Sequence, residues 1–196
     1  MIIPLMIKNQ KTQPIVDSTL SNHEALRQNP DSPCPSELIS DLELFEVNYY
    51  SFDGQIHIGQ IVAHKDLVRD ILGAFHLLCA EKFPIQSAIP IADARFMWDD
   101  TLSTKANNTS AYNFRNVRDT DEISNHATGR ALDINPRLNP YFPGQKVFPA
   151  DATYNPNVPG TILADSKLVK YFTDLGWTWG ATWQDDPDYQ HFEKLA

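Results

Sequence analysis

The first clear pattern along the chain is a pair of runs rich in β-branched and aromatic residues, Leu42 to Tyr50 and Gln55 to Ala63. Phe52, Asp53 and Gly54 lie between the two runs. An Asp-Gly pair between two such runs is a strong local signal for a hairpin, because Gly tolerates the positive φ that tight turns require. We therefore expect two antiparallel strands here.

A helical pattern follows the hairpin. From Lys65 to Lys82 the apolar residues recur three and four positions apart, and Pro84 cannot continue a helix. A shorter helix is predicted further on, where Asp165 or Ser166 can cap its start and Gly176 can end it. We expect the apolar face of the first helix to pack on the sheet. That face comprises Leu67, Val68, Ile71, Leu72, Phe75, Leu78 and Cys79.

Three short apolar segments predict further strands. They are Ile85 to Ala92, where Pro90 favours an edge or bulge position, then Ala131 to Ile134, and Trp177 to Trp179. The order of these elements predicts an α+β domain built on a mainly antiparallel sheet with flanking helices.

Two stretches between the predicted elements have loop composition. Trp98 to Asn108 is polar and rich in turn-forming residues. Asn135 to Pro159 is long, rich in proline and interspersed with aromatic residues. A connection of this length inside a domain is usually functional or mobile. Its aromatic residues are expected either to border a substrate groove or to pack on the core.

The first 40 residues differ from the rest in composition. From Lys8 to about Ser40 the chain is rich in Asn, Gln, Ser, Pro and Asp. We expect a partly ordered N-terminal arm over residues 1–40 and a folded domain over residues 41–196. The apolar start, Met1 to Lys8, is short and has no basic residues before it, so it is not a clear signal peptide.

Composition narrows the classes of partner. A chain of 196 residues can build one domain with a substantial core. The formal charge of -9 argues against a nucleic-acid partner, because phosphate binding depends on Lys and Arg. No run approaches the roughly 18 apolar residues of a membrane span. Cys34 and Cys79 match no zinc-binding pattern, and whether they pair stays open.

Two blocks near the C-terminus carry residue types that ligate zinc in hydrolases. His126 and Asp133 come from the first block and His191 from the second, while Asp188 could take a proton from water. Positions 126 and 133 are an odd number apart, so both can reach one metal only if the chain turns near Gly129. By spacing alone, His126 could equally bond a loop carbonyl and Asp133 cap a turn.

The residues between these candidate ligands add a resemblance to a known family. The run Ser-x-His-x-x-Gly-x-Ala-x-Asp from Ser124, with Asp-x-x-His ending at His191, resembles zinc peptidases that cut peptidoglycan stem peptides. These are D-alanyl-D-alanine carboxypeptidases and dipeptidases and L-alanyl-D-glutamate endopeptidases. The similarity extends over Leu42 to Lys194 and implies the fold shared with the signalling domain of Hedgehog proteins. It implies a Zn²⁺ cofactor with His126, Asp133 and His191 as ligands and Asp188 as the catalytic acidic residue.

The same family places an Arg after a short Ser-aromatic run, where it binds a substrate carboxylate. Ser110 to Arg115 fits this pattern, and a planar guanidinium suits a carboxylate. The alternative is a surface Arg115 paired with Asp119 or Asp121. Arg95, Arg118 and Arg130 are weaker candidates and are left out of the predicted site.

The acidic residue indicates which branch of the family applies. The carboxypeptidase and dipeptidase branches usually carry Glu where this chain has Asp188, whereas the L-alanyl-D-glutamate branch carries Asp. The resemblance therefore implies an L-alanyl-D-glutamate endopeptidase, with D-alanyl-D-alanine carboxypeptidase as the alternative. A non-catalytic zinc-bearing module that binds the cell wall is the alternative of another class. Peptidoglycan stem peptides as partner imply a cell-envelope or extracellular location, and we expect a monomer.

Overall fold

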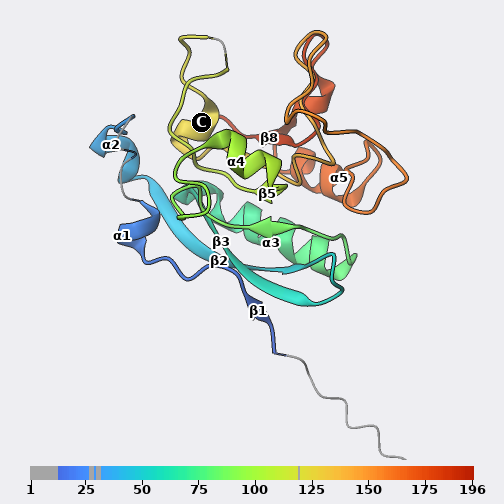
Figure 1. The fold of residues 1–196 in the computed structure, drawn as a ribbon, viewed down its shortest axis with the longest axis horizontal. Helices are drawn as coiled ribbons and strands as arrows, with labels where there is room; N and C mark the ends of the chain where they lie inside the picture. Colours follow the sequence, from blue (N-terminus) through green and yellow to red (C-terminus); the bar gives the residue numbers. More distant parts are fainter. Residues whose placement is uncertain (1–12, 27–28, 30–31, 119) are drawn as a thin grey trace, which may run out of the picture.

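The computed structural model describes residues 13–26, 29, 32–118 and 120–196. The prediction for Met1 to Lys8 lies outside the described residues. The expected hairpin is confirmed: β2 (Leu42–Tyr50) pairs antiparallel with β3 (Ile56–His64) along its whole length. Gly54 makes the turn with a φ of 82°. The hairpin forms one side of the molecule, away from the long loops (Figure 1).

The described part of the arm packs on this hairpin. Strand β1 (Ile15–Val16) adds to the free edge of β3 in parallel, and two short helices follow, α1 (Asn22–Ala25) and α2 (Ser36–Ile39). Ala25 and Cys34 are buried in an apolar cluster with residues of β2 and β3. No disulfide bond joins Cys34 to Cys79.

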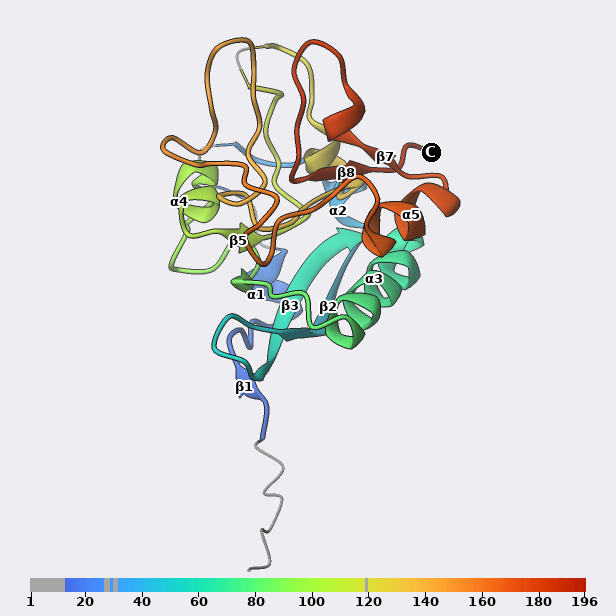
Figure 2. The same cartoon turned by 90° about the vertical axis from the view of Figure 1, so that its right-hand side faces the viewer.

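One helix covers the other side of the hairpin, and a second helix lies against the first (Figure 2). Helix α3 (Val68–Ala80) follows a 3₁₀ turn, Lys65–Leu67, and packs on β2, as its apolar face predicts. Helix α5 (Lys167–Asp174) lies against α3, and the Ser166 side chain caps its first turn. Within the described residues, no helix is long and apolar enough to cross a membrane.

A second three-stranded sheet lies beyond α5. Its strands β6 (Ala131–Asp133), β8 (His191–Glu193) and β7 (Thr178–Trp179) are antiparallel and lie in the order β6, β8, β7. Phe192 of β8 is fully buried, and its ring centroid lies 4.7 Å from that of Phe172 on α5. The same core contains residues of β2, β3 and α3. The two sheets are therefore joined through one apolar core, and the α+β class is confirmed.

Two predictions between the sheets were wrong in extent or type. Of Ile85 to Ala92, only β4 (Ser87–Ala88) is a strand, in parallel with β5 (Asn108–Thr109). The stretch predicted as a loop contains helix α4 (Asp100–Lys105). The Asp99 side chain accepts hydrogen bonds from the backbone of Thr101 and Leu102, and this N-cap stabilises a helix too short to show a period.

The connection 135–159 is without α-helix or strand, as predicted. Tyr141 forms isolated bridges to Phe148 and to Asp188. In Figure 2 this connection and the loops that contain residues 115–118, 120–123 and 183–188 project from the same end of the molecule, opposite β1. These loops surround the site described next.

Candidate metal centre

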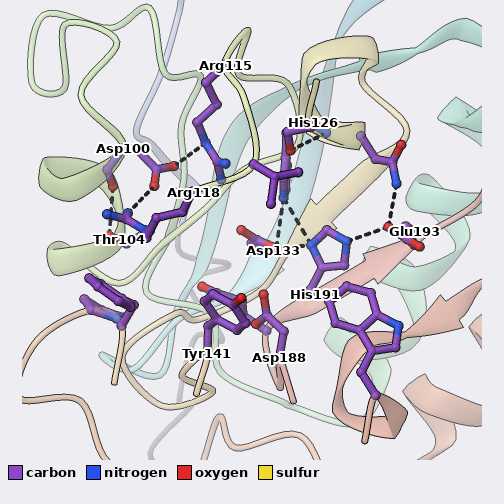
Figure 3. A pocket seen from close by; sticks show the side chains of 17 residues that line it. Asp100, Thr104, Arg115, Arg118, His126, Asp133, Tyr141, Asp188, His191 and Glu193 are labelled. Atoms are coloured by element: carbon purple, nitrogen blue, oxygen red, sulfur yellow. Dashed lines mark hydrogen bonds and ion pairs between the residues drawn. The ribbon is translucent and has the colours of Figure 1, made fainter. Parts of the chain in front are cut away.

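Three buried donor atoms converge at one end of the second sheet (Figure 3). His126 Nε2 lies 3.2 Å from His191 Nδ1 and 3.2 Å from Asp133 Oδ1, and the last two atoms are 3.1 Å apart. Ligands about 2.0–2.1 Å from a tetrahedral zinc are roughly 3.3 Å from one another, so a single ion can reach all three. Two imidazoles and one carboxylate are a donor set that zinc accepts, and the predicted ligands are brought together.

Local backbone features place these donors. The Ser124 side chain caps the 3₁₀ turn Asn125–Thr128, which carries His126, and Gly129 then reverses the chain with a φ of 67°. A Cβ at Gly129 would lie 2.6 Å from the backbone nitrogen of His64, so only glycine fits. Asp133 then pairs directly with His191 across β6 and β8. The turn that the spacing requires is present.

Further hydrogen bonds orient both rings. His126 Nδ1 lies 2.6 Å from the carbonyl oxygen of Ala111 and donates to it, which leaves the Nε2 lone pair facing the other donors. His191 Nε2 donates to Glu193 Oε2 over 3.0 Å, so its Nδ1 is the free acceptor. Asn125 Nδ2 donates to the same Glu193 oxygen over 2.7 Å. The ligand atoms are thus set before any metal arrives.

Glu193 and Asn125 were missed in the sequence. Residues two positions apart in a strand lie on the same face. Glu193 follows His191 by two positions, so it could have been predicted once that strand was recognised. Asn125 gave no such signal, because its role depends on the pairing of β6 with β8.

The donor side chains shift one another's pKa values strongly. Burial would raise the pKa of Asp133, but the charges and hydrogen bonds of His126 and His191 hold it well below its usual range. Burial opposes the charge on His191, and its hydrogen bonds to Asp133 and Glu193 nevertheless raise its pKa to about 10. A metal ion bound here would displace the proton that these carboxylates favour on His191, because imidazole ligates a metal in its neutral form.

Asp188 lies in the same pocket and is buried. Burial, aided by the negative charge of Asp133, raises the pKa of Asp188 to about 7. Its Oδ1 atom has no hydrogen-bond partner within the described residues. A buried carboxylate oxygen without a partner is costly, so this atom is suited to a ligand or a water in the pocket.

The absence of a side chain at Gly180 allows the Asp188 backbone to pack directly against it. Asp188 N donates to the carbonyl oxygen of Gly180 over 3.1 Å, and a Cβ on Gly180 would lie 2.7 Å from the Asp188 carbonyl oxygen. A larger residue at position 180 would push the Asp188 backbone away from the three donors.

Two arginines line the opposite end of the pocket. Arg115 Nε lies 3.2 Å from Asp100 Oδ1, and Arg118 Nη2 lies 3.3 Å from Asp100 Oδ2. Arg118, a weaker candidate in the sequence, therefore lines the same pocket, since the chain after Arg115 brings it back to Asp100 at the start of α4. The partner of Arg115 in the structure is Asp100, on an element that the sequence did not predict. Arg95 pairs with Asp93, and Arg130 with Asp66.

A comparison with known families agrees with this site. Residues 118–194 match the model of a family described as D-alanyl-D-alanine carboxypeptidase. The matched segment contains the three donors and Asp188, and it begins after Arg115. The match confirms the resemblance to this peptidase family over these residues. No curated protein and no solved structure matches the chain.

Proposed function

We propose that this chain, which carries the D-alanyl-D-alanine carboxypeptidase pattern over residues 118–194, is a zinc peptidase that hydrolyses the L-alanyl-D-glutamate bond of peptidoglycan stem peptides. The observation that carries the proposal is the convergence of His126, Asp133 and His191 beside Asp188, whose Oδ1 atom has no partner among the described residues. The substrate class implies work in the cell envelope or outside the cell.

His126, Asp133 and His191 would hold the zinc ion. When bound there, zinc supplies a Lewis acid for the scissile carbonyl and lowers the pKa of a water toward about 7. Asp188, which lines the same pocket, would accept on Oδ1 the proton of the water that attacks the carbonyl carbon. The same carboxyl then returns the proton to the departing nitrogen as the C–N bond breaks.

Arg115 would anchor the substrate. Its Nε is occupied by Asp100, and its Nη1 donates to the carbonyl oxygen of Asn116, which fixes the plane of the guanidinium. The remaining N–H groups can bind a carboxylate of the stem peptide. A carboxylate anchored in the same pocket as the three donors would hold the scissile bond in place and reduce the motions that must be frozen before reaction.

The choice of bond rests on Asp188. An aspartate at this position resembles the endopeptidase branch, as the sequence implies. The description of the matched family supports a second candidate, a D-alanyl-D-alanine carboxypeptidase. Arg115 suits either substrate, because each offers a carboxylate close to the bond.

Mass analysis of a defined stem pentapeptide after incubation with the zinc-loaded protein tests the proposal. Release of L-alanine together with a D-glutamyl fragment is expected. Release of free D-alanine alone would replace the proposal with the carboxypeptidase. An intact peptide in the presence of bound zinc would instead favour a non-catalytic wall-binding module.

A further inference from the structure

Two cationic side chains share one carboxylate in the part of the pocket away from the metal donors. Asp100 lies between Arg115 and Arg118 and binds one guanidinium with each of its oxygens (Figure 3). Asn113 Nδ2 also donates to Asp100 Oδ1, over 3.3 Å. Asp100 is thus held at the first turn of α4 and sets the spacing of both arginines.

This cluster carries a net positive charge. Two guanidiniums face one carboxylate, so one positive charge is left to be matched in a chain whose overall charge is -9. A guanidinium has five N–H donors, and the contacts with Asp100 use one of them on Arg118. Both the charge and the geometry therefore fit one additional carboxylate.

Arg118 is also fixed from its other side. Its Cζ atom lies 4.3 Å from the centre of the Phe148 ring, which belongs to the long connection 135–159 and lines the same pocket. A guanidinium over an aromatic face is held by a cation–π contact and keeps its N–H donors available at its edges. Arg118 is thus held between a ring and a carboxylate, while 35% of its side chain stays exposed to a ligand.

We propose that Arg118 acts together with Arg115 as a clamp for one substrate carboxylate, and that Asp100 positions both guanidiniums. The inference rests on the proposed function for the identity of the ligand. In the stem peptide the chain continues from the side-chain carboxyl of D-glutamate, so its α-carboxylate is free. That carboxylate is two bonds from the nitrogen that leaves. The clamp would select substrates with a free carboxylate there over those with a carboxamide.

Two synthetic stem peptides that differ only in this group test the inference. The ratio of kcat/KM for the carboxylate over the carboxamide peptide is measured in the zinc-loaded protein and its variants. A charge-assisted hydrogen bond lost from the clamp should lower this ratio about tenfold or more in Arg118→Gln. Arg118→Lys keeps the charge but loses the paired N–H groups of the guanidinium. Its ratio should lie between those of the parent protein and Arg118→Gln. Arg69→Gln, an exposed arginine on α3, is the matched control and should keep the ratio of the parent protein.

A binding measurement separates this inference from the proposed function. Calorimetry with a D-glutamyl product fragment and its carboxamide needs no cleavage. Weaker discrimination by Arg118→Gln in binding supports the clamp even when no peptide is hydrolysed. An unchanged ratio in Arg118→Gln, with zinc content and melting temperature equal to those of the parent, would overturn the clamp and leave the peptidase proposal intact. If Arg118→Gln fails to fold, the same readings on Arg118→Lys decide, and an unchanged ratio there overturns the clamp.

Discussion

At the scale of single residues, the candidate metal centre concentrates negative charge in a buried place. Asp133 and Asp188 are both buried, and Glu193 lies half-buried beside His191. Buried carboxylates are costly unless a cation or several donors compensate them. Burial and the charge of Asp133 raise the pKa of Asp188, whereas His126 and His191 keep the pKa of Asp133 low. A divalent cation would compensate the negative charge of both carboxylates.

The first prediction concerns the proposed base. Asp188→Asn keeps the size of the side chain but removes its ability to accept the proton, so turnover of the stem peptide should fall on the order of 10²-fold or more. Zinc content, measured by elemental analysis, should stay near that of the parent protein. Asp185→Asn, at an exposed position on the same loop, is the control and should be close to fully active. Near-normal turnover in Asp188→Asn would remove this residue from the mechanism.

A second prediction concerns the residue behind the metal ligand. Glu193→Gln removes the negative charge that accepts the Nε2 proton of His191, so this ring becomes a weaker and less well oriented ligand. We expect zinc affinity to fall roughly 10- to 100-fold in a competition assay with a chelator. Glu43→Gln, on the exposed face of β2, should bind zinc as the parent does. Equal affinity in both variants would contradict the role of Glu193.

At the scale of elements, a small polar cluster fastens the N-terminal strand to the hairpin. Asp17, directly after β1, accepts hydrogen bonds from Tyr49 of β2 and from His57 of β3. His57 also lies 3.1 Å from Asp53 in the hairpin turn. Burial opposes a charge on His57, but the two carboxylates outweigh it and raise the pKa of His57. One imidazole thus links three segments.

This cluster makes a pH-dependent contribution to stability. Because the folded-state pKa of His57 is raised, its contribution is fully present below the unfolded pKa of about 6.5 and is lost as pH rises through the folded value. His57→Gln should therefore lower the free energy of unfolding more at pH 5.5 than at pH 9, with a difference of about 1 kcal/mol. Denaturant titrations at both pH values check this. His76→Gln, exposed on α3, is the control, and a pH dependence equal to that control would refute the assignment.

The sequence predicted elements whose pattern repeats over several turns or strand positions. The hairpin and α3 are of this kind. The metal donor set could be predicted for a different reason, because its residues lie in two compact sequence blocks. Helix α4 was missed because six residues cannot show a helical period, and its stability comes from the Asp99 cap. The sequence ranked Arg118 as a weaker candidate for a related reason: its place in the pocket depends on Asp100 and Phe148, which lie 18 and 30 positions away and come close only through tertiary structure.

At the scale of the whole molecule, the metal centre ties the end of the chain to its middle. His126 and Asp133 belong to the middle, and His191 lies five residues before the last residue. The strand of His191 also brings Phe192 into the core shared by both sheets. Zinc bound here would cross-link the last strand to the body of the protein.

Removal of the metal should therefore destabilise the fold. A ligand that binds the folded state at a thousandfold excess over its Kd stabilises it by about 4 kcal/mol. For a chain of this size, this corresponds to roughly 10 °C in the melting temperature. We expect a chelator to lower the Tm of the parent protein by about this amount and to have little effect on His126→Ala, as measured by scanning calorimetry. Equal shifts in the two proteins would contradict binding at this site.

The glycine turn at position 129 has a consequence for how such a site can be inherited. Its carbonyl accepts a hydrogen bond from His64 N over 2.9 Å, and the Ala111 carbonyl orients His126. Both partners lie before residue 118, where the family match begins. The segment 118–194 is thus a unit of sequence similarity but not a transferable module. A recombination event that moved it alone to another protein would carry every proposed zinc ligand and leave behind the backbone that aligns them.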